Sequence, residues 1–208
     1  MIAIIDYGVG NLFSLAHSLK AIGAQPVVTG DAQVIRRAER VILPGVGAFG
    51  DAAKKLRQTG LDLLAKDIAA RGTPIMGICL GMQLLLDKSY EFGEHAGLGL
   101  IPGEVRPIAE VIPAELKIPH IGWNALDIRR PHPILANIRP GDCVYFVHSY
   151  YGAKCDESVI ATAEYGAPLT AAVARGNVCG CQFHPEKSGD KGLSILKAFC
   201  EWDGDASC

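Results

Sequence analysis

Apolar runs alternate with segments of helical periodicity through the first half of the chain. A short apolar run predicts a buried strand, and apolar residues three or four positions apart predict a helix. The predicted strands are residues 2–5, 26–29, 40–43 and 74–78, and the predicted helices are residues 12–22, 48–57, 61–71 and 80–86. Strands that alternate with helices are typical of an α/β fold with a parallel sheet between layers of helices.

After about Leu98 the pattern changes to short apolar segments separated by Pro and Gly turns. These segments predict further strands, and the last one predicts a helix that packs on the sheet. The strands are expected at residues 105–112, 118–128, 144–150, 159–163, 170–175 and 178–183, and the helix at 193–202. No long linker or repeat interrupts the chain, so we expect one domain over residues 1–202 and a polar tail at 203–208.

The composition is that of an ordinary globular protein, with 49% apolar and 20% charged residues among 208. A net charge of −2 gives no electrostatic reason to expect a nucleic acid or an anionic membrane as a partner. The N-terminus carries neither a signal segment nor an apolar stretch long enough to cross a membrane. We therefore expect a cytoplasmic protein whose seven cysteines are mostly reduced.

One of these cysteines, Cys79, stands between Gly77 and Gly81. It directly follows a predicted strand and precedes a predicted helix, and such an elbow exposes the residue at its tip. Glycines tolerate the crowding at an elbow because they have no side chain, and the N-terminus of a helix favours a thiolate. The motif therefore suits a cysteine nucleophile. Taken alone, it also suits a buried structural cysteine in a tight turn.

His184 and Glu186 lie far along the chain from Cys79 and follow an apolar predicted strand. In α/β folds the ends of strands are where functional residues gather, and Pro185 stiffens the segment between the two side chains. A cysteine nucleophile needs a base, and the base needs a third group that sets its tautomer. Taken alone, the segment suits a surface His-Pro-Glu turn. Together with Cys79 it favours a Cys–His–Glu triad.

Acyl chemistry also needs backbone N–H groups that face the carbonyl oxygen of the substrate. Gly47, in the loop after the predicted strand at 40–43, and Leu80, directly after the nucleophile, are the candidates. A plain glycine turn is the alternative interpretation of that loop.

No cofactor and no metal are expected. The glycines after the first strand lack the third glycine of a dinucleotide-binding loop. Cys179 and Cys181 precede His184 at a spacing that could suggest a metal site, but no clear fourth ligand is nearby. Buried strand cysteines are the better interpretation.

Five segments, at residues 4–12, 43–50, 119–124, 145–150 and 184–189, together with the motif at 77–83, resemble the class I (triad) glutamine amidotransferases. Within that family the resemblance is closer to the glutaminase subunits of imidazole glycerol phosphate synthases. It extends over nearly the whole chain and leaves out the tail after Trp202, Cys179 and Cys181.

The resemblance implies a three-layer α/β fold with a mixed, mostly parallel central sheet. It implies hydrolysis of L-glutamine to glutamate and ammonia, with Cys79 as the nucleophile, His184 as the acid and base, and Glu186 as the residue that orients His184. It also implies a heterodimer with a (β/α)8-barrel cyclase subunit, which uses the ammonia to make imidazole glycerol phosphate and AICAR in histidine biosynthesis.

Further roles follow from the same resemblance. Stabilisation of the oxyanion is assigned to Gly47 and Leu80. Glutamine binding is assigned to Gln83, Glu91, His148, Ser149 and Tyr150. The face that meets the cyclase and gates ammonia is assigned to Asn11, Trp123, Tyr145 and Lys187. Two alternatives stay open: a glutaminase for another synthase or a related cysteine hydrolase, and a regulatory subunit that has kept the fold without the activity.

Overall fold

A central sheet of eight strands organises residues 1–205, which are the part of the chain that the computed structural model describes. Five of the strands are parallel to one another, and three antiparallel strands extend the sheet on one side. In spatial order the strands are β2 (Pro26–Thr29), β1 (Ile2–Ile5), β3 (Arg40–Leu43), β4 (Ile75–Ile78), β14 (Val178–Cys181), β13 (Pro168–Arg175), β12 (Val159–Glu164) and β9 (Asp127–Ile128).

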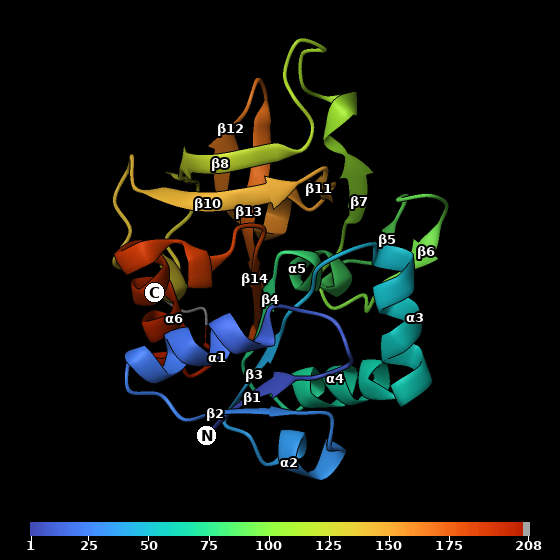
Figure 1. Cartoon of the computed structure of the whole chain (residues 1–208), viewed down its shortest axis with the longest axis vertical. Helices are drawn as coiled ribbons and strands as arrows, with labels where there is room; N and C mark the ends of the chain where they lie inside the picture. The colour runs from blue at the N-terminus through green and yellow to red at the C-terminus, as the bar shows by residue number, and fades with distance from the viewer. Residues whose placement is uncertain (206–208) are drawn as a thin grey trace.

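Helices cover both faces of this sheet (Figure 1). Along β1, Ile4 packs into one apolar core, while Ala3 and Ile5 pack into the other. The first core contains α1 (Leu12–Ala21) and α6 (Gly189–Glu201). The second contains α2 (Ala32–Arg36), α3 (Phe49–Thr59), α4 (Leu61–Ala70) and α5 (Leu80–Leu85). A strand buried on both faces needs apolar residues at every position, and the predicted three-layer α/β fold is confirmed.

Two smaller sheets lie beyond the carboxyl ends of β4 and β14, in the upper half of Figure 1. One pairs β8 (His120–Ala125) with β10 (Cys143–His148) in antiparallel orientation. The other contains β11 (Tyr150–Ala153), β7 (Glu104–Pro107), β5 (Lys88–Ser89) and β6 (His95–Ala96). Parallel strands place their following residues at one edge of a sheet, and these two sheets enclose that edge.

The structure corrects several of the predicted elements. The strand expected at 105–112 ends at Pro107, and a 3₁₀ turn at Ile108–Glu110 buries Ile108 in a small separate core. The strands expected at 118–128 and 144–150 are each divided in two, because β8 and β10 pair with each other while β9 and β11 join other sheets. The elements α2, β5 and β6 are too short to give a periodic pattern, and they were not predicted.

The C-terminal helix α6 begins earlier than expected, at Gly189, and ends before Trp202. Trp202 donates its indole N–H to the carbonyl of Asp205 at 2.6 Å. Residues 206–208 of the predicted polar tail lie outside the described residues. Among the described helices, none combines the length and the apolar character needed to cross a membrane.

Candidate active site

Cys79 occupies the elbow between β4 and α5. Its backbone has a φ of 55° and a ψ of −112°, a conformation that residues with a side chain rarely adopt. A backbone held in such a region costs on the order of 1–3 kcal/mol and persists only where the surroundings impose it. Here the N–H of Cys79 donates to the carbonyl of Cys181 on β14 at 2.7 Å. Strand β14 therefore helps to hold the elbow in place.

The two glycines around Cys79 permit close packing of this elbow. A Cβ on Gly77 would lie 2.6 Å from the carbonyl oxygen of Gly81, and a Cβ on Gly81 would lie 1.9 Å from the carbonyl oxygen of Leu43. Both distances are shorter than any real Cβ contact. The prediction that Gly77 and Gly81 fit a crowded elbow is confirmed.

His184 and Glu186 form a buried pair at the carboxyl end of β14. Nδ1 of His184 lies 2.8 Å from Oε1 of Glu186, and each side chain is only 3% exposed. The backbone of His184 is held at both ends, because its N–H donates to the carbonyl of Tyr145 and its carbonyl accepts the hydroxyl of Ser188. A hydrogen bond from Nδ1 to a carboxylate leaves Nε2 available for chemistry.

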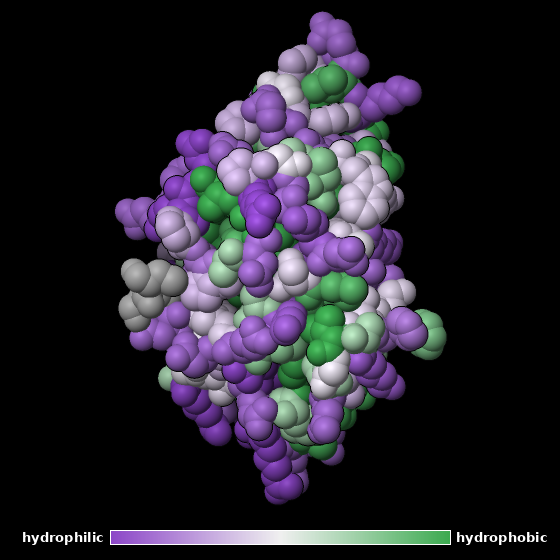
Figure 2. Space-filling view, turned by 90° about the vertical axis from the view of Figure 1, so that its left-hand side faces the viewer, coloured by the Kyte–Doolittle hydropathy of each residue, from purple (hydrophilic) through white to green (hydrophobic). Residues whose placement is uncertain are grey.

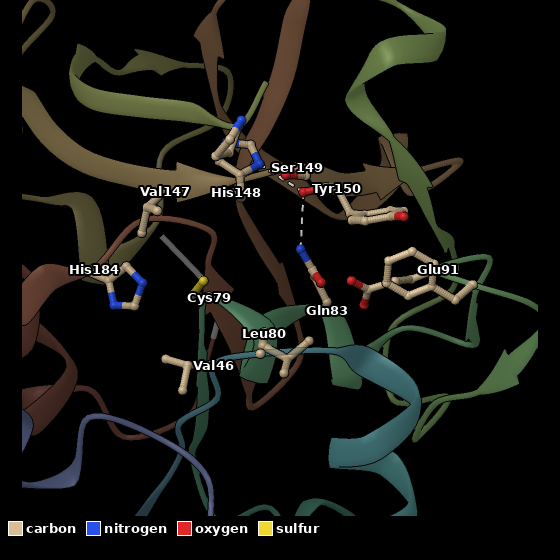
Figure 3. A pocket seen from close by; sticks show the side chains of 13 residues that line it. Val46, Cys79, Leu80, Gln83, Glu91, Val147, His148, Ser149, Tyr150 and His184 are labelled. Atoms are coloured by element: carbon tan, nitrogen blue, oxygen red, sulfur yellow. Dashed lines mark hydrogen bonds between the residues drawn. The ribbon is translucent and has the colours of Figure 1, made fainter. Parts of the chain in front are cut away.

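The protonation of His184 reflects two opposing effects. Burial lowers its pKa, but hydrogen bonds and charge interactions with Cys79 and Glu186 outweigh burial and raise the pKa to about 9. His184 therefore carries a proton at neutral pH, and its ring lies beside Cys79 (Figure 3). The three side chains that the sequence separates are brought together by the adjacent strands β4 and β14.

A cavity of about 500 Å³ opens in front of Cys79 and His184, a size typical of small-molecule sites. It is lined by every residue predicted to stabilise the oxyanion or to bind glutamine, and Figure 3 shows most of their side chains. The predicted residues that line it are Cys79, His184, Gly47, Leu80, Gln83, Glu91, His148, Ser149 and Tyr150. Sequence reasoning did not assign the other lining residues, which are Val46, Phe92, Pro119 and Val147.

Glu91 lies on the far side of the cavity from Cys79, with Gln83 between them (Figure 3). Oε2 of Glu91 accepts the N–H of Phe49, the first residue of α3, at 2.6 Å. Burial raises the pKa of Glu91, and this hydrogen bond opposes the rise. The cavity thus has the thiol of Cys79 at one end and the carboxyl group of Glu91 at the other.

The loop before α3 supplies Gly47, whose φ of 88° favours glycine. Leu80 is the first residue of α5, so its N–H has no acceptor within the helix. Both residues line the cavity together with Cys79. Their assignment to the oxyanion stays a prediction.

His148 belongs to a directional chain of hydrogen bonds. Its Nδ1 lies 2.8 Å from the carbonyl of Tyr150, which can only accept, so its Nε2 must accept from Nδ1 of His120 at 2.9 Å. Nε2 of His120 is then left to accept from Nδ2 of Asn124. Burial lowers the pKa of His148 to about 4 and also lowers that of His120, so both rings are neutral at pH 7. His120 is not among the residues predicted for the site, and the structure places it in contact with His148.

Three of the four residues predicted to face a partner are in contact with one another. The rings of Trp123 and Tyr145 meet edge to face with centroids 6.0 Å apart, and Nζ of Lys187 lies 5.8 Å from the centre of the Tyr145 ring. Trp123 is 57% exposed, as is Ile121 on the same side of β8. Asn11 lies just before α1, and that helix contacts the 3₁₀ turn at Pro185–Lys187. The partner-facing role of these residues stays a prediction.

Among the described residues, the surface on the α1 and α6 side of the molecule has no large exposed apolar patch in Figure 2. Figure 2 shows mostly hydrophilic residues there, with apolar residues in small separate groups.

Cys179 and Cys181 are fully buried on β14, and burial raises the pKa of both thiols. Cys181 donates its thiol to the carbonyl of Phe183 at 3.5 Å. Within residues 1–205, no three His, Cys, Asp or Glu side chains are grouped as a metal site.

Residues 3–201 match the model of the family described as glutamine amidotransferase class-I. The chain belongs to this family. Curated relatives named imidazole glycerol phosphate synthase subunit HisH cover nearly the same length. That of Listeria monocytogenes serotype 4a (strain HCC23) is 49% identical, over 97% of this chain and 95% of its own. That of Geobacter sulfurreducens is 50% identical, over 96% of this chain and 98% of its own.

Two solved structures share the fold of this chain. A structure of PurLQS from Thermotoga maritima matches with a TM-score of 0.75 and 22% identity, over 96% of this chain and 97% of the other. A crystal structure titled glutamine amidotransferase matches with a TM-score of 0.74 and 18% identity, over 96% of this chain and all of the other.

Proposed function

We propose that this chain hydrolyses L-glutamine to glutamate and ammonia through a Cys79–His184–Glu186 triad. The observation that carries the proposal is the position of Cys79, on a strained elbow, in a cavity that also contains His184 and an acidic residue at its far end. Glutamine has an amide at one end and an α-amino group at the other. An amide placed at Cys79 brings the ammonium group toward Glu91.

The first half of the reaction breaks the carbon–nitrogen bond of the amide. The Cys79 thiolate attacks the amide carbon, and the negative charge that develops on the oxygen is stabilised by the N–H groups of Gly47 and Leu80. His184, which carries a proton at neutral pH, gives that proton to the departing nitrogen. Ammonia leaves, and a γ-glutamyl thioester remains on Cys79.

The second half restores the enzyme. Neutral His184 takes a proton from water, and the resulting hydroxide attacks the thioester carbon. The thiolate departs, the new carboxylic acid gives its proton to the surrounding water, glutamate is released, and His184 again carries its proton. Glu186 stays ionised, holds the ring of His184 through Nδ1 and stabilises its positive charge.

We further propose that the chain is the glutaminase subunit of an imidazole glycerol phosphate synthase in histidine biosynthesis. The names and the near-complete coverage of the curated relatives support this assignment. In it, ammonia passes to a (β/α)8-barrel cyclase subunit that binds across Asn11, Trp123, Tyr145 and Lys187. Ammonia must stay unprotonated to act as a nucleophile in the partner, so a site closed off from water by that partner suits the chemistry.

A single variant separates glutamine hydrolysis by this chain from the use of ammonia by the cyclase. In the complex with the cyclase, Cys79→Ala should abolish glutamine hydrolysis and leave cyclisation with added ammonia intact. Cys200→Ala, which changes a half-buried cysteine on α6, is the matched control and should keep both activities. Glutamine hydrolysis by the Cys79→Ala complex would show that the mechanism is wrong. Robust hydrolysis by the isolated chain, without co-purification of a cyclase, would favour a glutaminase for a different synthase.

A further inference from the structure

Gln182 is a fully buried amide beside the nucleophile, and the mechanism above gives it no role. It follows β14 directly, and its backbone N–H donates to the carbonyl of Ala171 at 2.8 Å. The carbonyl just before it, on Cys181, accepts the N–H of Cys79 at 2.7 Å. Backbone hydrogen bonds on both sides of Gln182 therefore fix its position relative to the elbow.

Both ends of the Gln182 amide have partners. Nε2 lies 3.7 Å from Sγ of Cys79, and Oε1 lies 2.9 Å from Nε2 of Gln83. Nε2 of Gln83 also donates to the carbonyl of Tyr150 at 3.1 Å. Because an amide nitrogen can only donate, Gln182 must present its oxygen to Gln83 and its N–H to the sulfur. The opposite orientation would place two NH₂ groups against each other.

The sulfur is a better acceptor for this N–H when it is ionised, because hydrogen bonds to charged acceptors are the stronger ones. The titratable groups that interact with Cys79 are His184, Cys181 on β14 and Tyr7 after β1, and Glu186 interacts with it through His184. Gln182 differs from all of these because it cannot titrate. Its N–H therefore faces the sulfur at every pH, and a thiolate satisfies it best.

We propose that Gln182 is a positioning residue for glutamine hydrolysis. Its N–H holds the Cys79 sulfur as a thiolate facing the cavity, and its carbonyl orients Gln83 toward the substrate. One rigid amide thus sets the nucleophile and a substrate contact relative to each other. This role rests on the proposed glutaminase function.

Two substitutions separate the two ends of the amide. Gln182→Glu keeps the shape and the acceptor for Gln83 but places an oxygen against the sulfur. Gln182→Met keeps the approximate length and removes both polar ends. Thr170→Val is the matched control. Thr170 lies on β13, the strand next to β14, and its buried hydroxyl donates to the carbonyl of Gly152 at 2.7 Å. This substitution perturbs stability without touching Cys79.

The first measurement is the rate at which iodoacetamide alkylates Cys79 as a function of pH, followed by peptide mass spectrometry on the full chain. The midpoint should rise by about one pH unit or more in Gln182→Glu, the size of shift that a lost donor or a nearby carboxylate produces. It should rise by less in Gln182→Met and stay unchanged in Thr170→Val. An unchanged midpoint in a folded Gln182→Glu or Gln182→Met variant would overturn the proposal.

The second measurement is glutamine hydrolysis by the complex with the cyclase and its ligand. Gln182→Glu should lower kcat by about tenfold or more and change KM by about twofold or less, since its contact with Gln83 is kept. Equal losses in Gln182→Glu and Thr170→Val would mean that Gln182 is only structural. If the wild-type complex does not hydrolyse glutamine, the proposed function fails, and the alkylation profile still decides the role of Gln182.

Discussion

Gly81 offers a sharp test of how the elbow is built. It is the second residue of α5, and a Cβ there would lie 1.9 Å from the carbonyl oxygen of Leu43 at the end of β3. Gly152, a buried glycine of β11, would place its Cβ 3.3 Å from the side chain of Leu86, which a small adjustment accommodates. Gly81→Ala and Gly152→Ala are therefore a matched pair: both add one methyl group at a buried glycine, and only one meets a backbone atom.

The size of the effect follows from that contact. Real Cβ atoms essentially never come within 3.0 Å of another heavy atom, so Gly81→Ala requires α5 and β3 to separate by 1.1 Å or more. Forcing extra volume into a packed core costs about 1–3 kcal/mol, and each kcal/mol lowers the Tm of a chain of this size by about 2–4 °C. Because α5 begins directly after Cys79, Cys79 also moves, and a misplacement of about 1 Å in a reacting group costs on the order of 10²-fold in rate.

Calorimetry and a glutaminase assay of the complex with the cyclase measure both effects. We expect Gly81→Ala to lose several degrees of Tm and about two orders of magnitude in kcat/KM, while Gly152→Ala stays close to the wild-type protein. If Gly81→Ala kept its wild-type Tm and activity, α5 would not pack on β3 as the structure has it, and the account of the elbow would be wrong.

Three further predictions concern the residues around His184. Glu186→Gln removes the charge 2.8 Å from His184, so an NMR titration should place the His184 pKa below the value of about 9; an unchanged pKa would mean that the carboxylate does not hold the proton. A pKa raised from 6.5 to about 9 stabilises the fold fully below pH 6.5 and loses that contribution as pH rises through 9, so urea unfolding of Glu186→Gln should depend less on pH across this range than that of the wild-type protein. Lys187→Ala removes the cation next to the Tyr145 ring and should uncouple glutamine turnover from cyclisation, seen as excess glutamate over imidazole product. An unchanged ratio of the two products would exclude a gating role for Lys187.

Much of the fold could be predicted because four of the five parallel strands, all except the edge strand β2, are buried on both faces. Strands such as Ile2–Ile5 are continuous apolar runs, and the helices between them have clear periodicity. The antiparallel half was less predictable. Short edge strands such as His95–Ala96 carry no pattern of their own, and the ends of β8 and β10 depend on their pairing with each other rather than on local sequence.

The candidate site also has residues that the local sequence could identify and contacts that it could not. Cys79 and His184 could be identified because each follows a strand, and the two strands proved to be neighbours. The contact between His120 and His148 depends on the register of β8 against β10, which pairs these two residues, and no local signal in the sequence fixes a register. The role of Gln182 depends on which way its buried amide faces. That orientation is set by the hydrogen bond from Gln83, which lies on a helix far away in the sequence.

The central claim is that Cys79 carries the acyl group of glutamine. The most direct measurement is rapid acid quench of the complex during turnover with isotopically labelled glutamine, followed by mass spectrometry of its cysteine peptides. We predict a γ-glutamyl adduct on the Cys79 peptide and on none of the peptides that carry the other six cysteines. Labelled glutamate produced at the full rate with no adduct on Cys79, or with the adduct on another residue, would contradict it.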